Sequence, residues 1–371
     1  IQELPDANAA ESVARVPGVT IKREGGEGNK VVIRGLSPKY NSITVDGTRL
    51  ASTDADDRST DLSMISQYML DGIEVTKAGT PELDGDVLGG SVNFLLKKAK
   101  PGLHADIIAQ GMNNSLTETN DDNKLVIGIG NRFWKDRIGV FGQLDYENRN
   151  RSSNSLGGWY SNPGAKLDSM NALQLNSLNL YDIIRKNKRQ NQLLVLDFVV
   201  PNLFNITSDG LISYSYLNSS IYKDVIRYQD SYSLSTNAKM HTSGTNDSQI
   251  DVNTRTLKFK QTFFSDLHFD AFMSTSRSTN DQQTYKFDFA EPSAYTESTN
   301  NKTIDEIFQI SKKDTSYTGL EGYNFDYFYS NELEETFGVN LEYEFRLTKY
   351  LAGKIKVGNK FRTKTRSFDK N

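Results

Sequence analysis

A two-residue alternation of apolar and polar side chains runs through most of this chain and limits the folds open to it. In the segment 337–345, for example, Leu341 and Tyr343 share one parity, whereas Glu342 and Glu344 share the other. Successive side chains of a β-strand point to opposite faces, so a period of two predicts strands with one apolar and one polar face. The fold class is therefore predicted to be mainly β.

About nine segments carry this alternation, and each is near the length that crosses a tilted hydrocarbon band. They are Leu103–Met112, Leu125–Phe133, Arg137–Glu147, Leu194–Phe198, Ile212–Tyr216, Leu257–Phe263, Leu267–Met273, Phe337–Phe345 and Leu351–Phe361. We expect them to form transmembrane antiparallel β-barrel strands.

The connections between these segments alternate in length. The tight ones lie near 135–136, 201–205, 265–266 and 348–350, and the long polar ones near 151–190, 218–253 and 281–331. Short turns at one end and long loops at the other are the layout of an outer-membrane barrel. A soluble sandwich would not need that regular asymmetry.

The tight turns also predict how neighbouring strands pair. A two-residue turn at 135–136 places Phe133 opposite Ile138, and directly opposed residues share a face. A hairpin centred near Lys349 predicts the pairs Leu341 with Val357, Tyr343 with Ile355, Glu342 with Lys356, and Glu344 with Lys354. This register gives an apolar face, interpreted as lipid-facing, and a charge-paired face, interpreted as lumen-facing. A soluble β-meander with one wet face predicts the same pairs and stays open as an alternative.

Composition narrows the class of protein further. Mean hydropathy is −0.57, and no apolar run reaches the length of about 18 residues that a membrane-spanning helix needs. Barrel strands are apolar only at alternate residues, so low hydropathy is compatible with them. The 18 Tyr and 19 Phe suit strands and the aromatic girdles of a barrel.

The same composition argues against several kinds of chemistry. There is no Cys, and the 3 His show no metal-ligand spacing, so we expect no metal site and no cofactor. The net charge of −4 is too small to indicate a nucleic-acid partner. The sequence shows no nucleophile with a base and an orienting group, so we predict that the protein is not an enzyme.

The first hundred residues differ from the rest, because their elements are short and mixed. Helices are predicted at 8–16, 59–70 and 81–87, and strands at 19–23, 30–34, 42–46, 72–77 and 91–97. This composition of elements indicates a small α/β domain with a mixed sheet. We divide the chain near Lys100-Pro101, into residues 1–100 and residues 101–371.

Several motifs in residues 1–100 occur in one order. They are LPDANAAESVARVPGV at Leu4–Val19, Ile33-Arg34-Gly35, a Val45-Asp46-Gly47 turn, Ile73–Lys77, and Gly89–Asn93 with the sequence GGSVN. This order resembles the plug domain of TonB-dependent outer-membrane receptors. The resemblance covers about the first hundred residues and implies that residues 101–371 form the N-terminal part of the barrel.

The resemblance also implies a size and a place in the cell. A plugged barrel has about 22 strands, and an open edge in lipid leaves backbone groups unpaired, so these nine strands are expected to belong to a larger receptor. The expected location is the outer membrane of a Gram-negative bacterium, in contact with outer-membrane lipids. The segment Lys77–Pro81 resembles the variants found in receptors for carbohydrate or other nutrients.

The implied function is binding and active import of a nutrient, such as a carbohydrate or a siderophore, driven by a TonB-type inner-membrane energy-coupling complex. The ligand would be a small molecule or an oligosaccharide. Two other classes stay open. One is a structural or accessory barrel subunit of a larger outer-membrane complex, with surface lipoprotein partners held on loops such as 281–331. The other is a soluble β-rich binding protein.

Three groups of site residues follow. In the family that the sequence resembles, the Arg of the Ile-Arg-Gly motif pairs with barrel carboxylates and holds the plug. Here that residue is Arg34, with Glu342 and Glu344 as candidate partners, although glutamates on further strands are stronger candidates. The alternative is a solvated arginine in a turn.

The acidic loop 52–61, STDADDRSTD, is expected at the plug apex facing an incoming ligand. Asp54, Asp56, Asp57 and Arg58 would bind sugar hydroxyls there. The carboxylates could also coordinate Ca²⁺, but the loop lacks the Gly and the distal Glu of an EF-hand, so no metal site is predicted. A solvated loop that keeps the plug soluble is an equal alternative.

The predicted outer loops carry a set of aromatic residues, namely Trp159, Tyr160, Tyr323 and Tyr327. Their rings suit stacking on a sugar or contact with a peptide. The more conservative interpretation, which we favour, is that they serve as girdle or loop-packing residues. The Gly25–Gly28 segment precedes a strand, so it does not have the context of a phosphate-binding loop.

Overall fold

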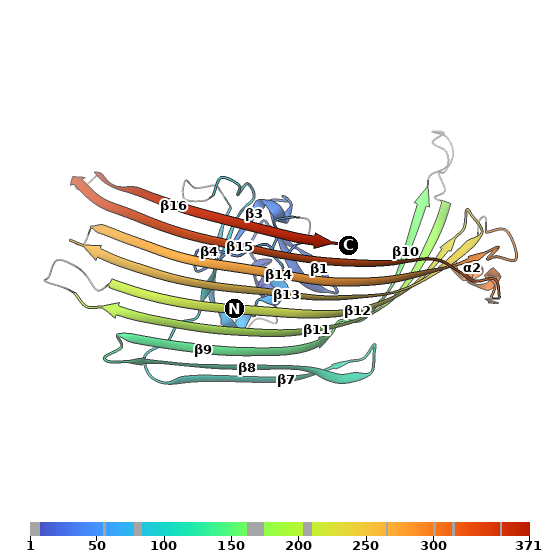
Figure 1. The fold of residues 1–371 in the computed structure, drawn as a ribbon, viewed down its shortest axis with the longest axis horizontal. Helices are drawn as coiled ribbons and strands as arrows, with labels where there is room; N and C mark the ends of the chain where they lie inside the picture. Colours follow the sequence, from blue (N-terminus) through green and yellow to red (C-terminus); the bar gives the residue numbers. More distant parts are fainter. Residues whose placement is uncertain are drawn as a thin grey trace.

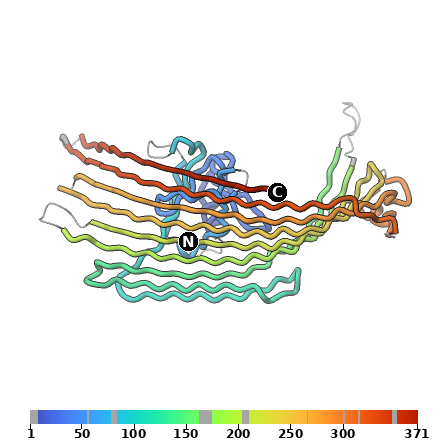
Figure 2. The backbone as a smooth tube through the Cα atoms, viewed as in Figure 1, coloured from blue at the N-terminus to red at the C-terminus, as the bar shows by residue number. Residues whose placement is uncertain are grey.

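A computed structural model describes residues 8–54, 57–77, 84–161, 174–202, 210–264, 266–299, 302–313, 316–348 and 351–371. Figures 1 and 2 show a broad, curved sheet of long strands, with the N-terminal residues gathered into a compact body against one of its faces. We call residues 8–96 the plug and the long-stranded sheet the wall.

The plug begins with a short helix and a hairpin. Helix α1 (Ala9–Val13) is capped by Asn8, whose side chain accepts a hydrogen bond from the N–H of Glu11. Strands β1 (Val19–Glu24) and β2 (Glu27–Ile33) pair antiparallel through a turn at Gly25-Gly26. Both glycines have positive φ, of 56° and 79°, which other residues rarely adopt.

A second plug sheet has four strands in the order β4-β3-β6-β5. The strands are β3 (Asn41–Val45), β4 (Thr48–Arg49), β5 (Leu70–Thr76) and β6 (Gly90–Leu96), and the short 3₁₀ helix η1 (Pro38–Tyr40) precedes β3. Strand β6 runs parallel to β3 and antiparallel to β5, so the predicted mixed sheet is confirmed.

The helix expected over 59–70 is wrong. The segment holds two 3₁₀ turns instead, η2 (Leu62–Met64) and η3 (Gln67–Met69). The side chains of Asp61 and Ser66 each accept a hydrogen bond from the N–H two residues on, so each caps the start of one of the two turns. Every residue of 61–70 is buried, so its apolar pattern does not mark one face of a helix. The helix predicted at 81–87 lies partly outside the described residues.

The wall is an antiparallel meander in the order β7-β8-β9-β11-β12-β13-β14-β15-β16, with β10 paired to β11 beside it. Its strands are β7 (His104–Asn114), β8 (Thr119–Phe133), β9 (Ile138–Asn150), β10 (Ser153–Ser161), β11 (Gln174–Val200), β12 (Gly210–Ser233), β13 (Ala238–Phe263), β14 (Leu267–Pro292), β15 (Gly319–Thr348) and β16 (Leu351–Lys370). Each of the nine predicted segments overlaps a strand of this meander.

The predicted registers are confirmed. Phe133 lies opposite Ile138 across the β8–β9 turn. In the β15–β16 hairpin the opposed pairs are Leu341 with Val357, Tyr343 with Ile355, Glu342 with Lys356, and Glu344 with Lys354.

The long loops predicted at 218–253 and 281–331 are wrong, because most of these residues continue the strands. The turn between β12 and β13 spans only 234–237, and β14 extends to Pro292. A short helix, α2 (Ile304–Ile310), lies between β14 and β15. Residues 151–190 likewise contain β10 and the first part of β11. Both faces of a strand can be polar outside lipid. The apolar–polar alternation therefore ends there, while the backbone hydrogen bonds between neighbouring strands continue.

Plug and wall share one apolar core. It joins Ile33 and Phe94 of the plug to Leu217, Ile221 and Val252 of the wall. On the opposite face of the wall large apolar side chains are exposed, among them Leu341 and Val357. None of the helices in the described residues combines the length and the apolarity needed to cross a bilayer. The boundary near Lys100-Pro101 stays a prediction.

Candidate functional site

A buried cluster of charges around Glu27, the first residue of β2, fastens the plug to the wall. The Glu27 carboxylate accepts a hydrogen bond from Arg151 at 2.6 Å and pairs with Arg189. Arg189 also donates to Glu147 at 2.7 Å, and Lys124 pairs with Glu147 at 2.7 Å. Burial alone would raise the pKa of Glu27, but the two arginines outweigh it and hold that pKa below its ordinary value. Glu27 therefore remains ionised at neutral pH.

A second contact joins Asp61 of the plug to Lys223 of β12. Their charged atoms lie 2.8 Å apart, and both side chains are largely buried. Lys223 also lies 3.5 Å from Glu24, and Arg185 of β11 lies 3.8 Å from Glu24. Burial would raise the pKa of Asp61, but the charge of Lys223 lowers it overall. The two longer contacts of Glu24 are looser than the Asp61–Lys223 pair.

A third contact involves the segment that leads into β6. Asp84 pairs with Lys360 at 2.8 Å and with Arg362 at 2.5 Å, both on β16. Asp86 pairs with Arg49 of β4 at 3.0 Å. Burial opposes these pairs, but the neighbouring cations lower the pKa of both aspartates. The segment is thereby tied both to the plug and to the wall.

The backbone of 51–53 is bound directly by wall side chains. One N–H donates to Ser276 at 2.9 Å, and the next donates to Glu332 at 2.8 Å. The carbonyl of the third residue accepts a hydrogen bond from Asn280 at 3.0 Å. These bonds hold the start of the acidic loop in a fixed position above the core.

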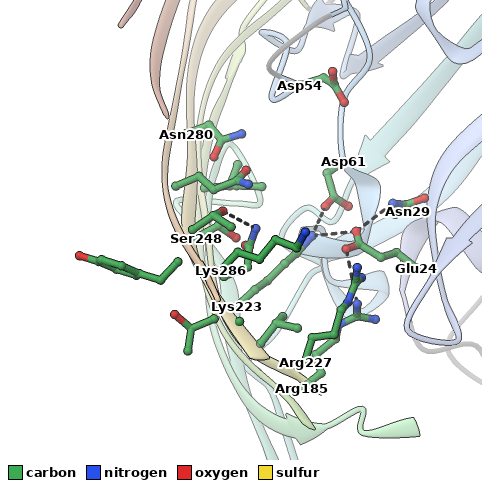
Figure 3. Close-up of a pocket in the computed structure, with 18 of the residues that line it drawn as sticks. Glu24, Asn29, Asp54, Asp61, Arg185, Lys223, Arg227, Ser248, Asn280 and Lys286 are labelled. Carbon is green, nitrogen blue, oxygen red and sulfur yellow. Dashed lines mark hydrogen bonds and ion pairs between the residues drawn. The ribbon is translucent and has the colours of Figure 1, made fainter. Parts of the chain in front are cut away.

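A cavity of about 430 Å³ lies between the plug and the wall beside this loop. Figure 3 shows Glu24, Asn29, Asp54 and Asp61 reaching into it from the plug, opposite side chains of the wall. The cations in its described lining are Lys30, Arg185, Lys223, Arg227 and Lys286. The carboxylates are Glu24, Asp54 and Asp61, so cations outnumber them. Its volume falls within the range of roughly 300–1,000 Å³ typical of ligand pockets.

The structure does not bring Arg34 to Glu342 or Glu344. Arg34 is exposed in a turn with φ of 56°, and no acidic side chain among the described residues pairs with it. Glu342 instead lies 3.1 Å from Lys354. The described ion pairs between plug and wall are made by the plug carboxylates Glu24, Glu27, Asp61, Asp84 and Asp86, none of which the sequence analysis selected.

The predicted apex residues lie in different surroundings. Asp54 lines the cavity and pairs with Lys30. The Asp57 side chain accepts a hydrogen bond from the N–H of Ser59 at 2.7 Å, so it shapes the loop. Arg58 is exposed and lies 3.3 Å from Asp86. Asp56 lies outside the described residues.

The predicted outer aromatics lie on strands, and the structure does not gather them at the cavity. Trp159 and Tyr160 are exposed on β10, which projects from one end of the wall in Figure 1. Tyr323 and Tyr327 lie on β15, and the Tyr323 side chain is 77% exposed. Their part in ligand binding stays a prediction.

The residues that sequence reasoning missed carry little signal of their own. The run around Arg185 and Arg189 is polar at both parities, so the alternation cannot assign an inward face. Glu27 stands in a glycine-rich turn, where an exposed carboxylate is the ordinary expectation.

Residues 1–91 match the family model described as the TonB-dependent Receptor Plug Domain. The plug of this chain therefore matches the plug domain of the TonB-dependent receptors. The vitamin B12 transporter BtuB of Vibrio vulnificus (strain YJ016) is 29% identical over 97 residues, which are 25% of this chain and 16% of BtuB. The chain therefore matches only a small part of the length of this curated relative.

Two solved structures of TonB-dependent receptors are also similar. The ferric preacinetobactin receptor BauA from Acinetobacter baumannii has a TM-score of 0.41 and 14% identity, over 95% of this chain and 54% of BauA. The unliganded ferric citrate transporter FecA has a TM-score of 0.37 and 10% identity, over 100% of this chain and 58% of FecA. The family whose plug domain residues 1–91 match consists of outer-membrane proteins.

Proposed function

We propose that this chain is the plug-bearing part of a receptor that binds a nutrient ligand in the cavity and imports it through a plugged barrel. In this proposal residues 1–100 are the plug and residues 101–371 the first barrel strands. A barrel of about 22 strands has a lumen too wide to select ligands, so the plug must close it. A TonB-type inner-membrane complex would supply the energy that opens a path.

The observation that carries this proposal is the chemistry of the plug–wall contact. Glu27, Asp61 and Asp84 bind the wall through ion pairs as well as the shared apolar core. Buried ion pairs contribute little net stability, because desolvation offsets most of their attraction. Water that enters along such a seam rehydrates both partners, so the plug can separate from the wall at lower cost than from a wholly apolar wall. We infer that this interface is suited to opening.

The ligand itself is proposed only as a class. The cavity presents many neutral hydrogen-bonding groups, including Thr242, Asn246 and Asn280, which suit a polar nutrient such as a carbohydrate or a siderophore. BtuB is named as a vitamin B12 transporter, but its match to this chain is short. It supports uptake as the activity and leaves the ligand open. We propose no catalytic step.

One observation favours the second candidate, an accessory subunit of a larger outer-membrane complex. Strand β10 projects from the wall and exposes Leu156 and Tyr160, which have the same parity and offer an apolar contact for a surface lipoprotein. A subunit of this kind would hold partners and carry little transport.

The test separates the two candidates in cells that produce the native full-length receptor. We expect that deletion of the receptor and removal of TonB each abolish growth on the nutrient that the receptor imports. Ligand co-purifying from mild detergent, identified by mass spectrometry, would name that nutrient. Growth that is insensitive to TonB, together with recovery of the receptor in a large stable lipoprotein complex, would instead establish the accessory role.

A further inference from the structure

The wall side of the cavity carries one cation that stands apart from the others. Lys30 pairs with Asp54, Lys223 with Asp61, and Lys286 with Asp288. A contact of 3.8 Å joins Arg185 to Glu24. Of the lining cations, only Arg227 has no ion pair with any described residue. Its guanidinium is therefore available to a ligand.

Arg227 and Arg185 occupy neighbouring strands and the same face of the wall. In the β11–β12 ladder Arg227 pairs with Ile183, and Arg185 pairs with Val225, so the two arginines are diagonal neighbours. Diagonal side chains on one face are close enough for long residues to reach a common point. Figure 3 shows both below Glu24 at one end of the cavity. Two guanidinium groups at one point favour an oxyanion, which can accept several of their hydrogen bonds.

Glu24 already occupies the position that such an oxyanion would take. Its side chain is 48% exposed, and its carboxylate lies 3.8 Å from Arg185 and 3.5 Å from Lys223. Lys223 has a closer partner in Asp61, at 2.8 Å. An exposed carboxylate held by contacts of this length contributes little, so a better-placed anion can replace it.

We propose that the imported ligand bears a carboxylate, phosphate or sulfate group that binds between Arg227 and Arg185 and displaces Glu24. This inference rests on the proposed function of the cavity as the ligand site. The bound oxyanion leaves the Asp61–Lys223 pair in place.

The rest of the lining indicates what the oxyanion is attached to. Thr242, Asn246 and Ser248 of β13 and Asn280, Gln282 and Thr284 of β14 line the cavity, and each is a neutral donor or acceptor. Such groups match the hydroxyls of a sugar. Val225, Ile250 and Tyr285 also line the cavity and can contact the apolar faces of sugar rings. The class of ligand that fits both features is an acidic oligosaccharide.

Displacement of Glu24 would also affect neighbouring residues of the plug. Glu24 is followed by the Gly25-Gly26 turn and then by Glu27, the centre of the buried charge cluster. The Arg185 guanidinium lies directly against Gly25, since a Cβ built there would be 2.0 Å from Nη1. Ligand capture thus acts on the residue next to a turn that joins the cavity to the buried contact.

The experiment measures binding to the purified full-length receptor in detergent by calorimetry. The probes are a galacturonic acid trimer, its neutral methyl ester, inorganic phosphate and inorganic sulfate. We expect the trimer to bind and its methyl ester to bind at least about tenfold more weakly, because the ester has no negative charge and cannot form a bidentate ion pair with a guanidinium. Phosphate or sulfate should compete with the trimer.

Variants locate the site. Arg227→Gln should weaken binding of the trimer about tenfold or more, and Arg227→Lys should restore part of the lost affinity. Glu24→Gln should tighten binding several-fold, because the internal competitor loses its charge. Arg255→Gln removes an exposed cation from β13, outside the cavity lining, and should change nothing. A gain of affinity in Glu24→Gln cannot come from misfolding.

Three results would overturn the proposal. They are equal binding of the trimer and its methyl ester, equal effects of Arg227→Gln and Arg255→Gln, and no binding of any oxyanion probe at millimolar concentration. Growth assays distinguish this failure from failure of the proposed function. TonB-dependent uptake of a neutral nutrient would reject the oxyanion site while preserving import.

Discussion

Glu27 of the plug and Arg189 of the wall form a buried ion pair whose side chains are 2% and 5% exposed. The partners are 162 residues apart in the chain. Arg189 keeps a second partner in Glu147, so loss of the Glu27 charge would leave it partly compensated. Substitution of this pair therefore tests how strongly the plug binds to the wall.

The first prediction concerns this pair. Glu27→Gln should weaken the seating of the plug by roughly 2 kcal/mol, because Arg151 and Arg189 each lose a charged, buried acceptor. The measurement is amide hydrogen exchange of β2 (Glu27–Ile33) in the intact receptor, which should become faster. Glu297→Gln, in an exposed pair with Lys302, is the control and should leave that exchange unchanged. Equal exchange in wild type and Glu27→Gln would contradict the prediction.

The second prediction concerns acid. Because the cations beside Asp84 and Asp86 depress their pKa values, these groups stabilise the native state fully at pH values above the ordinary value of 3.8. Their contribution declines as pH falls through that value and is lost below the lowered pKa of the folded state. Proteolysis of the plug in the intact receptor should therefore increase at pH values below about 4.

An Asp84→Asn variant tests the origin of this acid effect. It should be more sensitive to protease at pH 7 than wild type, and it should show a smaller additional change on acidification. If the variant and the wild type share one pH profile, Asp84 does not supply the effect.

Sequence reasoning predicted pairings better than lengths. The β15–β16 register follows from one tight hairpin and the parity of residues such as Leu341 and Glu342, both of which are local. The lengths of β12 and β14 were underestimated because backbone hydrogen bonds between strands do not require apolar side chains once a strand leaves lipid. The 3₁₀ turns at 62–69 depend on single side-chain caps, which an apolar pattern does not reveal.

The candidate site was harder to predict than the fold. Asp54 was expected near the ligand, and it does line the cavity. The contacts of Glu27 could not be predicted, because they depend on how the plug sits against strands more than a hundred residues away. Arg34 has a recognisable motif, yet no described acidic residue pairs with it.

The third prediction uses two adjacent glycines. Gly25→Ala and Gly26→Ala should each cost about 1–2 kcal/mol, because both residues have positive φ. Only at Gly25 would the new methyl group meet Arg185, whereas nothing lies within 4 Å of a Cβ at Gly26. Thermal unfolding should therefore show a loss in both variants, and the loss should be at least as large in Gly25→Ala. Affinity for the galacturonic acid trimer should change only in Gly25→Ala, and a change in both would contradict the prediction.

The fourth prediction concerns the outer face of the wall. Val357 is 66% exposed on the face expected to contact lipid. Val357→Lys should lower the free energy of unfolding in vesicles by roughly 2 kcal/mol or more near the bilayer midplane. Lys356→Gln changes the adjacent residue on the opposite face and should have a smaller effect. The fraction folded in lipid vesicles is the readout, and a larger loss in Lys356→Gln would reverse the assignment of faces.

The length of the wall strands sets where the receptor meets its surroundings. Strand β15 has 30 residues, so it extends roughly 100 Å along its axis at about 3.3 Å per residue. A tilt of about 45° still leaves it roughly 70 Å tall, against a hydrocarbon layer of about 30 Å. More than half of the strand therefore stands above or below the lipid. Where these strands rise above the lipid, a nutrient would meet protein well before it reached the bilayer.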